Sequence, residues 1–192
     1  MSVSSKMVNA SPNVFWGELA PPEHLVQMYE NDDVFLDTLE GFVAGGLMAG
    51  DGVVVIATPQ HVRGLDARLE LRGIDAEAAT GTDRFIVLDA EETLAKFMHG
   101  GWPNDEDFHS LIKDILSRAG GNDRRVRAFG EMVAILWGRG NGAATVRLEY
   151  LWHNLCNQEK FTLFCAYPKI GFTEFTMDSM QDICNAHSRV IH

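Results

Sequence analysis

The sequence has few cysteines and few basic residues, and each shortage excludes a class of protein. Only three cysteines occur in 192 residues, Cys156, Cys165 and Cys184, and no C-x-x-C pair is among them. This spacing fits neither a disulfide framework nor a cysteine metal site, so we expect reduced, mostly buried thiols and a cytoplasmic protein. Lys and Arg number 16 against 27 Asp and Glu, a formal net charge of -11. We therefore expect neither nucleic acid nor an anionic membrane as a partner, because both select basic patches.

Long apolar runs are also missing. Residues 1–20 lack the apolar centre of a signal peptide, and the most apolar strand-like run, residues 53–57, is far too short to span a bilayer. We therefore expect a soluble protein. At roughly 150 residues per domain, the length corresponds to one domain. A chain of this size buries enough surface to fold without a metal or a disulfide.

Beyond residue 22, short apolar runs alternate with helical patterns. Residues 1–22 are polar and end in Pro21-Pro22, which predicts a flexible arm (carrying Phe15 and Trp16) before a single domain over 23–192. Strands are predicted over 25–29, 53–58, 84–88, 126–131 and 162–167. Helices are predicted over 35–47, 62–69, 108–119, 144–155 and 175–187. Continuous apolar strands that alternate with helices predict a three-layer α/β fold, with a mostly parallel five-stranded sheet and helices on both faces.

Ligands of such folds bind beyond the carboxyl ends of the strands, and the exit of the first strand is unlike a nucleotide site. A P-loop would place glycines and a Lys there, whereas residues 29–33 read Tyr-Glu-Asn-Asp-Asp. Residues 23–40 contain six acids and no Lys or Arg, so their carboxylates would repel a triphosphate. We therefore do not expect P-loop ATP hydrolysis. The alternative role of Asn31, Asp32 and Asp33 is to cap the following helix.

A glycine-rich segment at 138–143, Gly-Arg-Gly-Asn-Gly-Ala, nominally matches the dinucleotide-binding pattern G-x-G-x-x-[GA]. That pattern belongs after the first strand and needs an acid at the end of the next one, but the next predicted strand here ends in Ala-Tyr-Pro at 166–168. A flexible strand-to-helix loop is the favoured interpretation. An anion could still bind at the start of that helix.

Glu149, His153 and Cys156 fall at i, i+4 and i+7 on one predicted helix face. They could form a carboxylate–imidazole pair beside a thiol, or three metal ligands. A surface ion pair beside a packed cysteine is the commoner arrangement. The sequence contains no G-x-S-x-G elbow and no H-E-x-x-H pair. We therefore expect no catalytic residues, no metal and no enzyme activity.

Glu131 lies at the end of a predicted buried strand, where a carboxylate must be paired or neutral. It is a candidate for a polar group in a ligand pocket or for a general base. The alternative is a pair with a structural arginine such as Arg147. The only basic cluster, Arg124, Arg125 and Arg127, is expected on a solvated turn.

The order and spacing of several segments resemble the MEDS domain, the methanogen/methylotroph DcmR-type sensory domain, over residues 23–190. The matching segments are HLVQMYENDD at 24–33, GL at 46–47, GDG at 50–52, VIATP at 55–59, GID at 73–75, FGEMV at 129–133, LW at 136–137, LEYLWHNL at 148–155, FCAYP at 164–168 and ICNAHSRV at 183–190. The resemblance implies a RecA/KaiC-like fold with a degenerate P-loop. It also implies a sensor of small organic molecules, simple hydrocarbon derivatives included, in a family commonly attached to histidine kinases or DNA-binding domains.

The family's characteristic polar and aromatic positions become our ligand-binding candidates. They fall on His24, Tyr29, Glu30, Asp32, Glu131, Trp137, Glu149, Trp152, Tyr167 and His187. Where the family often has His-Ser-His, this chain has His187-Ser188-Arg189, so a two-histidine metal site is not carried over. No kinase or helix-turn-helix pattern occurs in the sequence. We therefore expect the signal to pass to a separate protein or through self-association.

The combined hypothesis is a stand-alone sensory domain that binds a small organic ligand and regulates a bacterial histidine kinase or transcription regulator in trans. Trp137, Trp152 and Tyr167 would supply apolar walls of the ligand pocket, and Glu131 and Tyr29 would supply polar contacts. The loop at 100–103 would be a moving lid, and no cofactor is expected. Two alternatives stay open: a degenerate, non-hydrolysing nucleotide-binding module, and a ligand-free interaction module of a two-component pathway.

Overall fold

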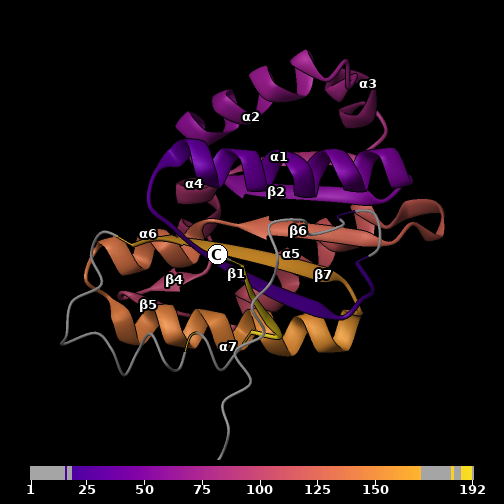
Figure 1. Cartoon of the computed structure of the whole chain (residues 1–192). Coiled ribbons are helices and arrows are strands. Elements are labelled where there is room, and N and C mark those ends of the chain that lie inside the picture. Colours follow the sequence, from indigo (N-terminus) through magenta and orange to yellow (C-terminus); the bar gives the residue numbers. More distant parts are fainter. Residues whose placement is uncertain (1–15, 17–18, 170–182, 184–186, 192) are drawn as a thin grey trace, which may run out of the picture.

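A single parallel sheet organises the chain (Figure 1). The computed structural model describes residues 16, 19–169, 183 and 187–191. The sheet has the strand order β3-β2-β6-β7-β1-β8, and every neighbouring pair in it is parallel. The strands are β1 (Glu23–Tyr29), β2 (Gly52–Ala57), β3 (Phe85–Asp89), β6 (Val126–Gly130), β7 (Thr162–Pro168) and β8 (Arg189–Ile191). The three-layer α/β architecture and all five predicted strands are confirmed.

The predicted number of strands is wrong, because the sheet has six strands and not five. The additional strand, β8, pairs with β1 in the register Leu25↔Arg189 and Gln27↔Ile191. It has only three residues and begins with an exposed arginine, so it lacks the apolar run that marks a buried strand. The helix predicted over 175–187 lies mostly outside the described residues.

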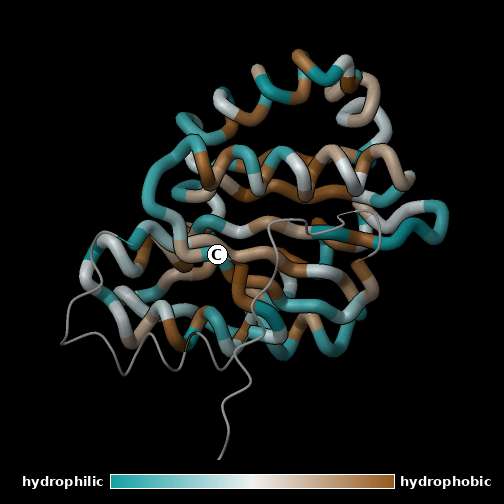
Figure 2. The backbone as a smooth tube through the Cα atoms, viewed as in Figure 1, coloured by the Kyte–Doolittle hydropathy of each residue, from teal (hydrophilic) through white to brown (hydrophobic). Residues whose placement is uncertain are grey.

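Helices cover both faces of the sheet, as Figure 1 shows. One face carries α1 (Asp32–Ala49), α2 (Pro59–Leu71) and α3 (Ala76–Thr80), and the other carries α4 (Ala90–Ala95), α5 (Asp105–Ala119), α6 (Met132–Gly138) and α7 (Gly142–Glu159). Strand β2 shows why both layers are needed. Val53 and Val55 belong to the core beneath α1, whereas Val54 and Ile56 belong to the core beneath α5. The apolar colours of Figure 2 accordingly concentrate on the strands and on the inner helix faces.

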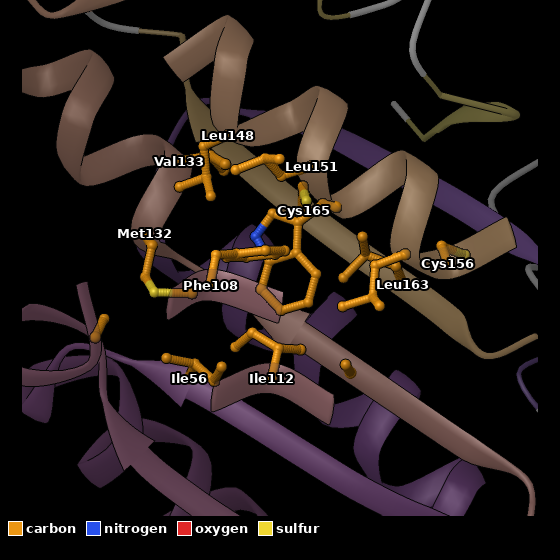
Figure 3. Close-up of a cluster of buried hydrophobic side chains, with 14 of the residues drawn as sticks. Ile56, Phe108, Ile112, Met132, Val133, Leu148, Leu151, Cys156, Leu163 and Cys165 are labelled. Atoms are coloured by element: carbon orange, nitrogen blue, oxygen red, sulfur yellow. The ribbon is translucent and has the colours of Figure 1, made fainter. Parts of the chain in front are cut away.

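The core on the α5 and α7 side is built around an aromatic pair. Phe108 of α5 meets Trp152 of α7 edge to face, with ring centroids 5.0 Å apart. Figure 3 shows Phe108 between Met132 and Leu163, with Ile112 on the same helix toward Ile56. Both rings are fully buried. This packing fixes α7 against the sheet, and α7 contributes Glu149 to the site described below.

The acidic exit of β1 serves the start of α1. The side chain of Asn31 accepts a hydrogen bond from the Val34 amide at 3.0 Å, and Asp32 and Asp33 occupy the first turn. Carboxylates are favoured there by the partial positive charge of a helix N-terminus. The capping alternative for this segment is therefore confirmed.

The prediction that the glycine-rich segment at 138–143 joins a strand to a helix is wrong, because the segment follows a helix. It joins α6 to α7, and the side chain of Asn141 caps α7 by accepting from the Ala144 amide at 3.3 Å. Helix α6 was missed because its sequence, MVAILWG, is a short apolar run. Periodicity cannot distinguish such a run from the continuation of a buried strand.

The prediction that the basic cluster at 124–127 lies on a solvated turn is wrong for Arg127. Arg127, on β6, is 2% exposed, and its Nε donates to Asp51 Oδ2 at 2.7 Å. Its Nη1 also donates to the carbonyl of Trp16, whose ring meets Phe42 edge to face with centroids 5.8 Å apart. Trp16 therefore packs on the domain of its own chain.

The segment predicted as a lid is the tip of a two-stranded hairpin. Strands β4 (Met98–His99) and β5 (Trp102–Pro103) pair antiparallel around Gly100 and Gly101. Both glycines have positive φ, 58° and 82°, a conformation that favours glycine. The carbonyl of Gly101 accepts from Asn141 Nδ2 at 2.9 Å, which links the hairpin to the loop before α7. Movement of this hairpin stays a prediction.

Candidate functional site

The structure gathers most of the predicted site residues into two separate polar clusters. The buried cluster consists of His24, Glu149, Cys165, Tyr167 and His187. The edge cluster consists of Tyr29, Asp32, Thr58, His61 and Glu131. The buried cluster contains one residue that was not among the sequence candidates, Cys165, and the edge cluster contains two, Thr58 and His61. The predictions that these residues bind a ligand stay untested.

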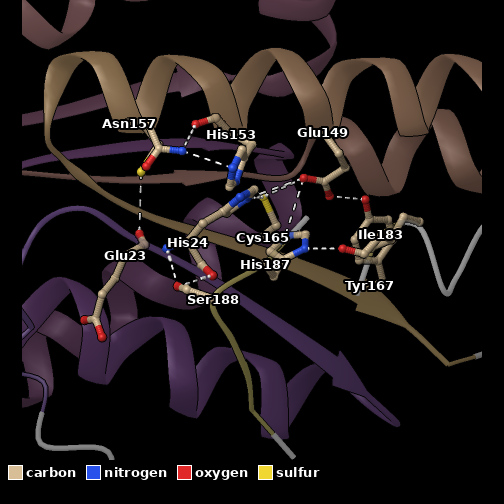
Figure 4. Close-up of polar contacts among 11 residues, drawn as sticks. Glu23, His24, Glu149, His153, Asn157, Cys165, Tyr167, Ile183, His187 and Ser188 are labelled. Carbon is tan, nitrogen blue, oxygen red and sulfur yellow. Dashed lines mark hydrogen bonds and ion pairs between the residues drawn. The ribbon is translucent and has the colours of Figure 1, made fainter. Parts of the chain in front are cut away.

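The buried cluster lies between the sheet and α7 (Figure 4). His24 comes from β1, Cys165 and Tyr167 come from β7, Glu149 comes from α7, and His187 lies two residues before β8. Glu149 Oε2 lies 3.4 Å from the Nε2 atoms of both histidines and 3.8 Å from Cys165 Sγ. Cys165 Sγ lies 3.5 Å from His24 Nε2. Four potential metal ligands therefore meet in one place, and their ligand atoms all lie within 4.8 Å of one another.

Burial controls the electrostatics of this cluster. It lowers the pKa of His187 to about 4 against the opposing charge of Glu149, so the ring is neutral at pH 7. Burial also raises the pKa of the Cys165 thiol well above its ordinary value, and the Glu149 charge raises it further. Burial would raise the pKa of Glu149 as well, but the charges that the His187 and His24 rings carry when protonated, with the hydrogen bonds from His24 and the Tyr167 hydroxyl, outweigh it and lower this pKa. The cluster is thus built around an ionised, buried carboxylate.

The predicted trio of Glu149, His153 and Cys156 does not form one site. Glu149 is 1% exposed and faces His24 and His187 across the helix–sheet interface. His153 instead contacts Asn157 on the next helical turn, with Nε2 3.0 Å from Asn157 Nδ2. Cys156 donates from its thiol to the Phe161 carbonyl at 3.0 Å. The helical spacing was correct, but residues from other elements decided which side chains Glu149 meets.

The edge cluster lies at the carboxyl ends of β1, β2 and β6. Glu131 accepts from the Thr58 amide at 2.7 Å and lies 2.8 Å from His61 Nδ1. His61 Nε2 in turn lies 3.7 Å from Asp32 Oδ2. Glu131 is 7% exposed, as expected for a paired carboxylate at a strand end.

The alternative prediction, that Glu131 pairs with Arg147, is wrong. Arg147 pairs with Asp105 instead, since it projects from α7 on the opposite side of the sheet from His61. His61 becomes the partner of Glu131 because α2 starts directly after β2 and its first turn brings the imidazole over the strand end.

The charges of the edge cluster favour a protonated His61. Burial alone would lower the pKa of His61, but the hydrogen bond to Glu131 and the charges of Glu131 and Asp32 raise it above its ordinary value. The pKa of Tyr29 is also raised, chiefly by burial and then by the Glu131 and Asp32 charges, so its hydroxyl stays protonated. Together these groups offer hydrogen-bond donors and acceptors at the expected ligand-binding edge.

The remaining three candidates lie outside the two clusters. Trp152 is fully buried between Phe108 and Phe161. Trp137 is 7% exposed and meets Tyr167 with ring centroids 6.3 Å apart. Glu30 is exposed and accepts from Lys169 Nζ at 2.8 Å, which lowers its pKa.

A pocket of about 320 Å³ lies near the same carboxyl edge, between α4, α6 and the β4–β5 hairpin. It is lined by Glu91, Leu94, Ala95, Met98, Gly101, Leu136, Arg139 and Asn141. Apolar side chains supply most of its wall, and Arg139 forms an ion pair with Glu91 at its rim. None of the ten sequence candidates lines this pocket.

The residues that sequence reasoning missed carried weak signals. Thr58 and Pro59 end a buried strand and start a helix, so His61 falls on the first turn above the expected ligand-binding edge. Cys165 lies at the centre of β7, between Phe164 and Ala166 in the sequence. A cysteine at such a position usually acts as a small hydrophobic residue. Only its contacts with Glu149 and His24 distinguish it.

The comparisons with known proteins agree with this architecture. The model of the family described as MEDS, MEthanogen/methylotroph, DcmR Sensory domain, matches residues 23–188. The chain belongs to the MEDS family. This membership supports a sensory role for the chain and confirms the resemblance seen in its sequence. The RecA/KaiC-like part of that resemblance stays a prediction.

One solved structure similar to this MEDS domain is a Pyrococcus horikoshii OT3 protein, described as a structural study of Project ID PH0250. The two share 9% sequence identity with a TM-score of 0.58, over 92% of this chain and 84% of the other. That likeness shows the fold alone. The search of curated proteins found no match. Within the described part of the chain, no helix has the length and apolar character needed to cross a membrane.

Proposed function

We propose that this MEDS domain is a cytoplasmic sensory module that binds a small, weakly polar organic molecule and regulates a separate signalling protein, a histidine kinase or a transcription regulator. The observation that carries the proposal is the pocket between α4, α6 and the β4–β5 hairpin. Its volume of about 320 Å³ is at the lower end of the range for ligand pockets, about 300–1,000 Å³. A site of this size selects a small molecule.

The lining of the pocket supports the same class of ligand. Leu94, Met98 and Leu136 supply apolar contacts, whereas Asn141 and Arg139 supply a few polar groups at the rim. A mostly apolar wall with few polar groups is typical of sites for weakly polar ligands. Ordinary nucleotide binding would need phosphate contacts as well, and the acidic rim residue Glu91 disfavours them.

The hairpin next to the pocket offers a route for the signal. Gly101 lines the pocket, and its neighbour Trp102 is 48% exposed. A ligand that contacts Gly101 and Met98 would favour one position of the hairpin over another. It would thereby change the surface around Trp102 that a partner protein meets. Ligand binding transmits a signal only through such a difference between two states.

The first test compares native and denaturing mass spectra of the purified protein. An excess mass that is lost on denaturation identifies the bound molecule and its size. Titration with a series of small alcohols, ketones and halogenated hydrocarbons then follows the fluorescence of Trp102, with Trp102→Phe as the variant that should lose the response. Saturable binding by at least one class supports the proposal, and no binding by any class, with no mass excess, contradicts it.

A pair of matched substitutions locates the site. Ala95→Phe places a larger side chain in the pocket from an exposed position of α4, so the fold should tolerate it. Ala78→Phe makes the same change from an exposed position of α3, beside a different pocket of about 380 Å³. We expect Ala95→Phe to weaken binding at least tenfold and Ala78→Phe to leave it unchanged. The reverse order would place the ligand elsewhere.

A further inference from the structure

We propose that the buried cluster binds one Zn²⁺ ion. The ligand atoms are His24 Nε2, Glu149 Oε2, Cys165 Sγ and His187 Nε2. The side chains of these residues are between 0% and 3% exposed. The site lies on the α7 side of β1 and β7, and none of its residues lines the ligand pocket, so the inference does not depend on the proposed sensory function.

The first argument is the spacing of the ligand atoms. Zinc bonds of about 2.0–2.3 Å in tetrahedral geometry place neighbouring ligand atoms about 3.3–3.7 Å apart. The four separations given by the structure are 3.4 Å for each histidine–Glu149 pair, 3.5 Å for Cys165–His24 and 3.8 Å for Cys165–Glu149. These are four of the six edges of a tetrahedron, each within about 0.3 Å of the zinc value, and all six separations are within 4.8 Å. Two imidazoles, a carboxylate and a thiolate are also ligand types that Zn²⁺ prefers.

The second argument concerns His187 and its hydrogen bond. His187 Nδ1 lies 2.6 Å from the Ile183 carbonyl, which can only accept, so the proton of the neutral ring sits on Nδ1. Nε2 then carries a lone pair, and it points at the carboxylate of Glu149 with no hydrogen-bond partner among the described residues. A lone pair facing a carboxylate is unfavourable unless a proton or a metal ion lies between them, and the proposal places Zn²⁺ at this point.

The arrangement around the ligands supports the same assignment. Metal-binding histidines usually donate their second N–H to a carbonyl or carboxylate, and metal-binding carboxylates are themselves hydrogen-bonded. His187 donates to Ile183, and Glu149 accepts from the Tyr167 hydroxyl through the oxygen that faces away from the histidines. The His24 and His187 rings lie 3.8 Å apart between centroids, which disfavours a second positive charge. Both are thus suited to bind as neutral imidazoles.

The charge of the filled site also balances. Binding releases the Cys165 thiol proton to solvent, because a coordinated thiol is deprotonated. The thiolate and the Glu149 carboxylate then offset the two charges of Zn²⁺, and the site becomes neutral in a buried environment. Four protein ligands leave no position for water, so this is a closed, structural type of site. Its effect is to tie His187 and the adjacent β8 to β1 and α7.

The experiment uses the full chain without a histidine tag, stripped of metal with a chelator and then titrated with Co²⁺ as a spectroscopic substitute for Zn²⁺. We expect one Co²⁺ per chain, the intense visible bands of a tetrahedral ion and a thiolate-to-cobalt charge-transfer band, all abolished by one equivalent of Zn²⁺. Cys165→Ser should lose the charge-transfer band. Cys156→Ser, which changes another buried free cysteine outside the cluster, should keep it.

The histidines have matched controls as well. His187→Gln should weaken Zn²⁺ binding by more than about 100-fold. Substituting a residue that only hydrogen-bonds to a metal ligand already lowers metal affinity about 10–100-fold. His99→Gln, on the β4–β5 hairpin, and His61→Gln, in the edge cluster, should each change the affinity less than threefold. A charge-transfer band that survives Cys165→Ser, or an equal loss in all three histidine variants, overturns the proposal.

A measurement without substitutions guards against variants that fail to fold. X-ray absorption of the zinc-loaded wild-type protein should show one sulfur and three nitrogen or oxygen ligands. Hydrogen exchange should slow in residues 187–191 when zinc is added, since the ion joins that segment to β1. Zinc bound without sulfur, or no zinc retained after removal of free metal, refutes the site whatever the variants do.

Discussion

The strongest stability prediction concerns Asp51, which pairs with two arginines of very different exposure. Arg127 is 2% exposed and lies 2.7 Å from the carboxylate, whereas the side chain of Arg125 is 49% exposed and lies 3.0 Å from it. Asp51→Asn leaves the Arg127 guanidinium charged, buried and without its counterion. Breaking a buried pair in this way costs about 3–5 kcal/mol. With a urea dependence of about 2 kcal/mol per M, the unfolding midpoint should fall by roughly 2 M.

Arg125→Gln is the matched control, because it removes the exposed partner of the same carboxylate. Exposed ion pairs contribute about 0–1 kcal/mol, so this variant should unfold near the wild-type midpoint. The double variant Asp51→Asn/Arg127→Met removes the uncompensated charge and should be more stable than Asp51→Asn alone. Urea unfolding followed by circular dichroism measures all of these. Equal losses for Asp51→Asn and Arg125→Gln, or strictly additive effects in the double variant, would refute the reasoning.

Two further predictions test the edge cluster and the packing of β2. The raised pKa of His61 means that its pairing with Glu131 stabilises the fold fully below the unfolded pKa of about 6.5, and that this contribution disappears as pH rises through the higher folded value. The stability difference between wild type and His61→Gln should therefore be larger near pH 5.5 than near pH 9, and a pH-independent difference would contradict the assigned pairing. Gly52→Ala would place its Cβ 2.1 Å from the Ala119 carbonyl oxygen and should cost at least about 1–3 kcal/mol. Gly138→Ala, with open space around its Cβ, should be neutral or stabilising by about 0.5–1 kcal/mol; similar losses in the two glycine variants would contradict this account of the packing.

The architecture could be predicted because it follows from local patterns. A strand such as β2 must be apolar on both faces when helices cover both sides, so Val53–Ile56 marks a buried parallel strand without any tertiary information. The predicted helices over 108–119 and 144–155 have clear apolar periods and are present as α5 and α7. Elements with little apolar length, such as β8, or with no period, such as α6, could not be recognised this way.

Individual residues of the candidate site could be predicted from the sequence, but the contacts between them could not. Glu131 and Asp32 were identified from their position after strands, and they do lie at the expected edge of the sheet. Their link through His61 depends on where the first turn of α2 falls over that edge. His24 and His187 were also identified, but separately, since they are 163 residues apart in the chain and the helical spacing of Glu149 pointed instead to His153.

By itself, the sequence determined the fold class, the family and the identity of most polar residues in the interior, because burial and helical or strand periods are local properties of the chain. Only the tertiary structure decided which of those polar residues meet. Parallel pairing of β1 with β7 places His24 beside the Cys165 region, α7 lays Glu149 across both strands, and β8 returns His187 to the same point. Contacts of this kind depend on strand order and register, which no local pattern specifies.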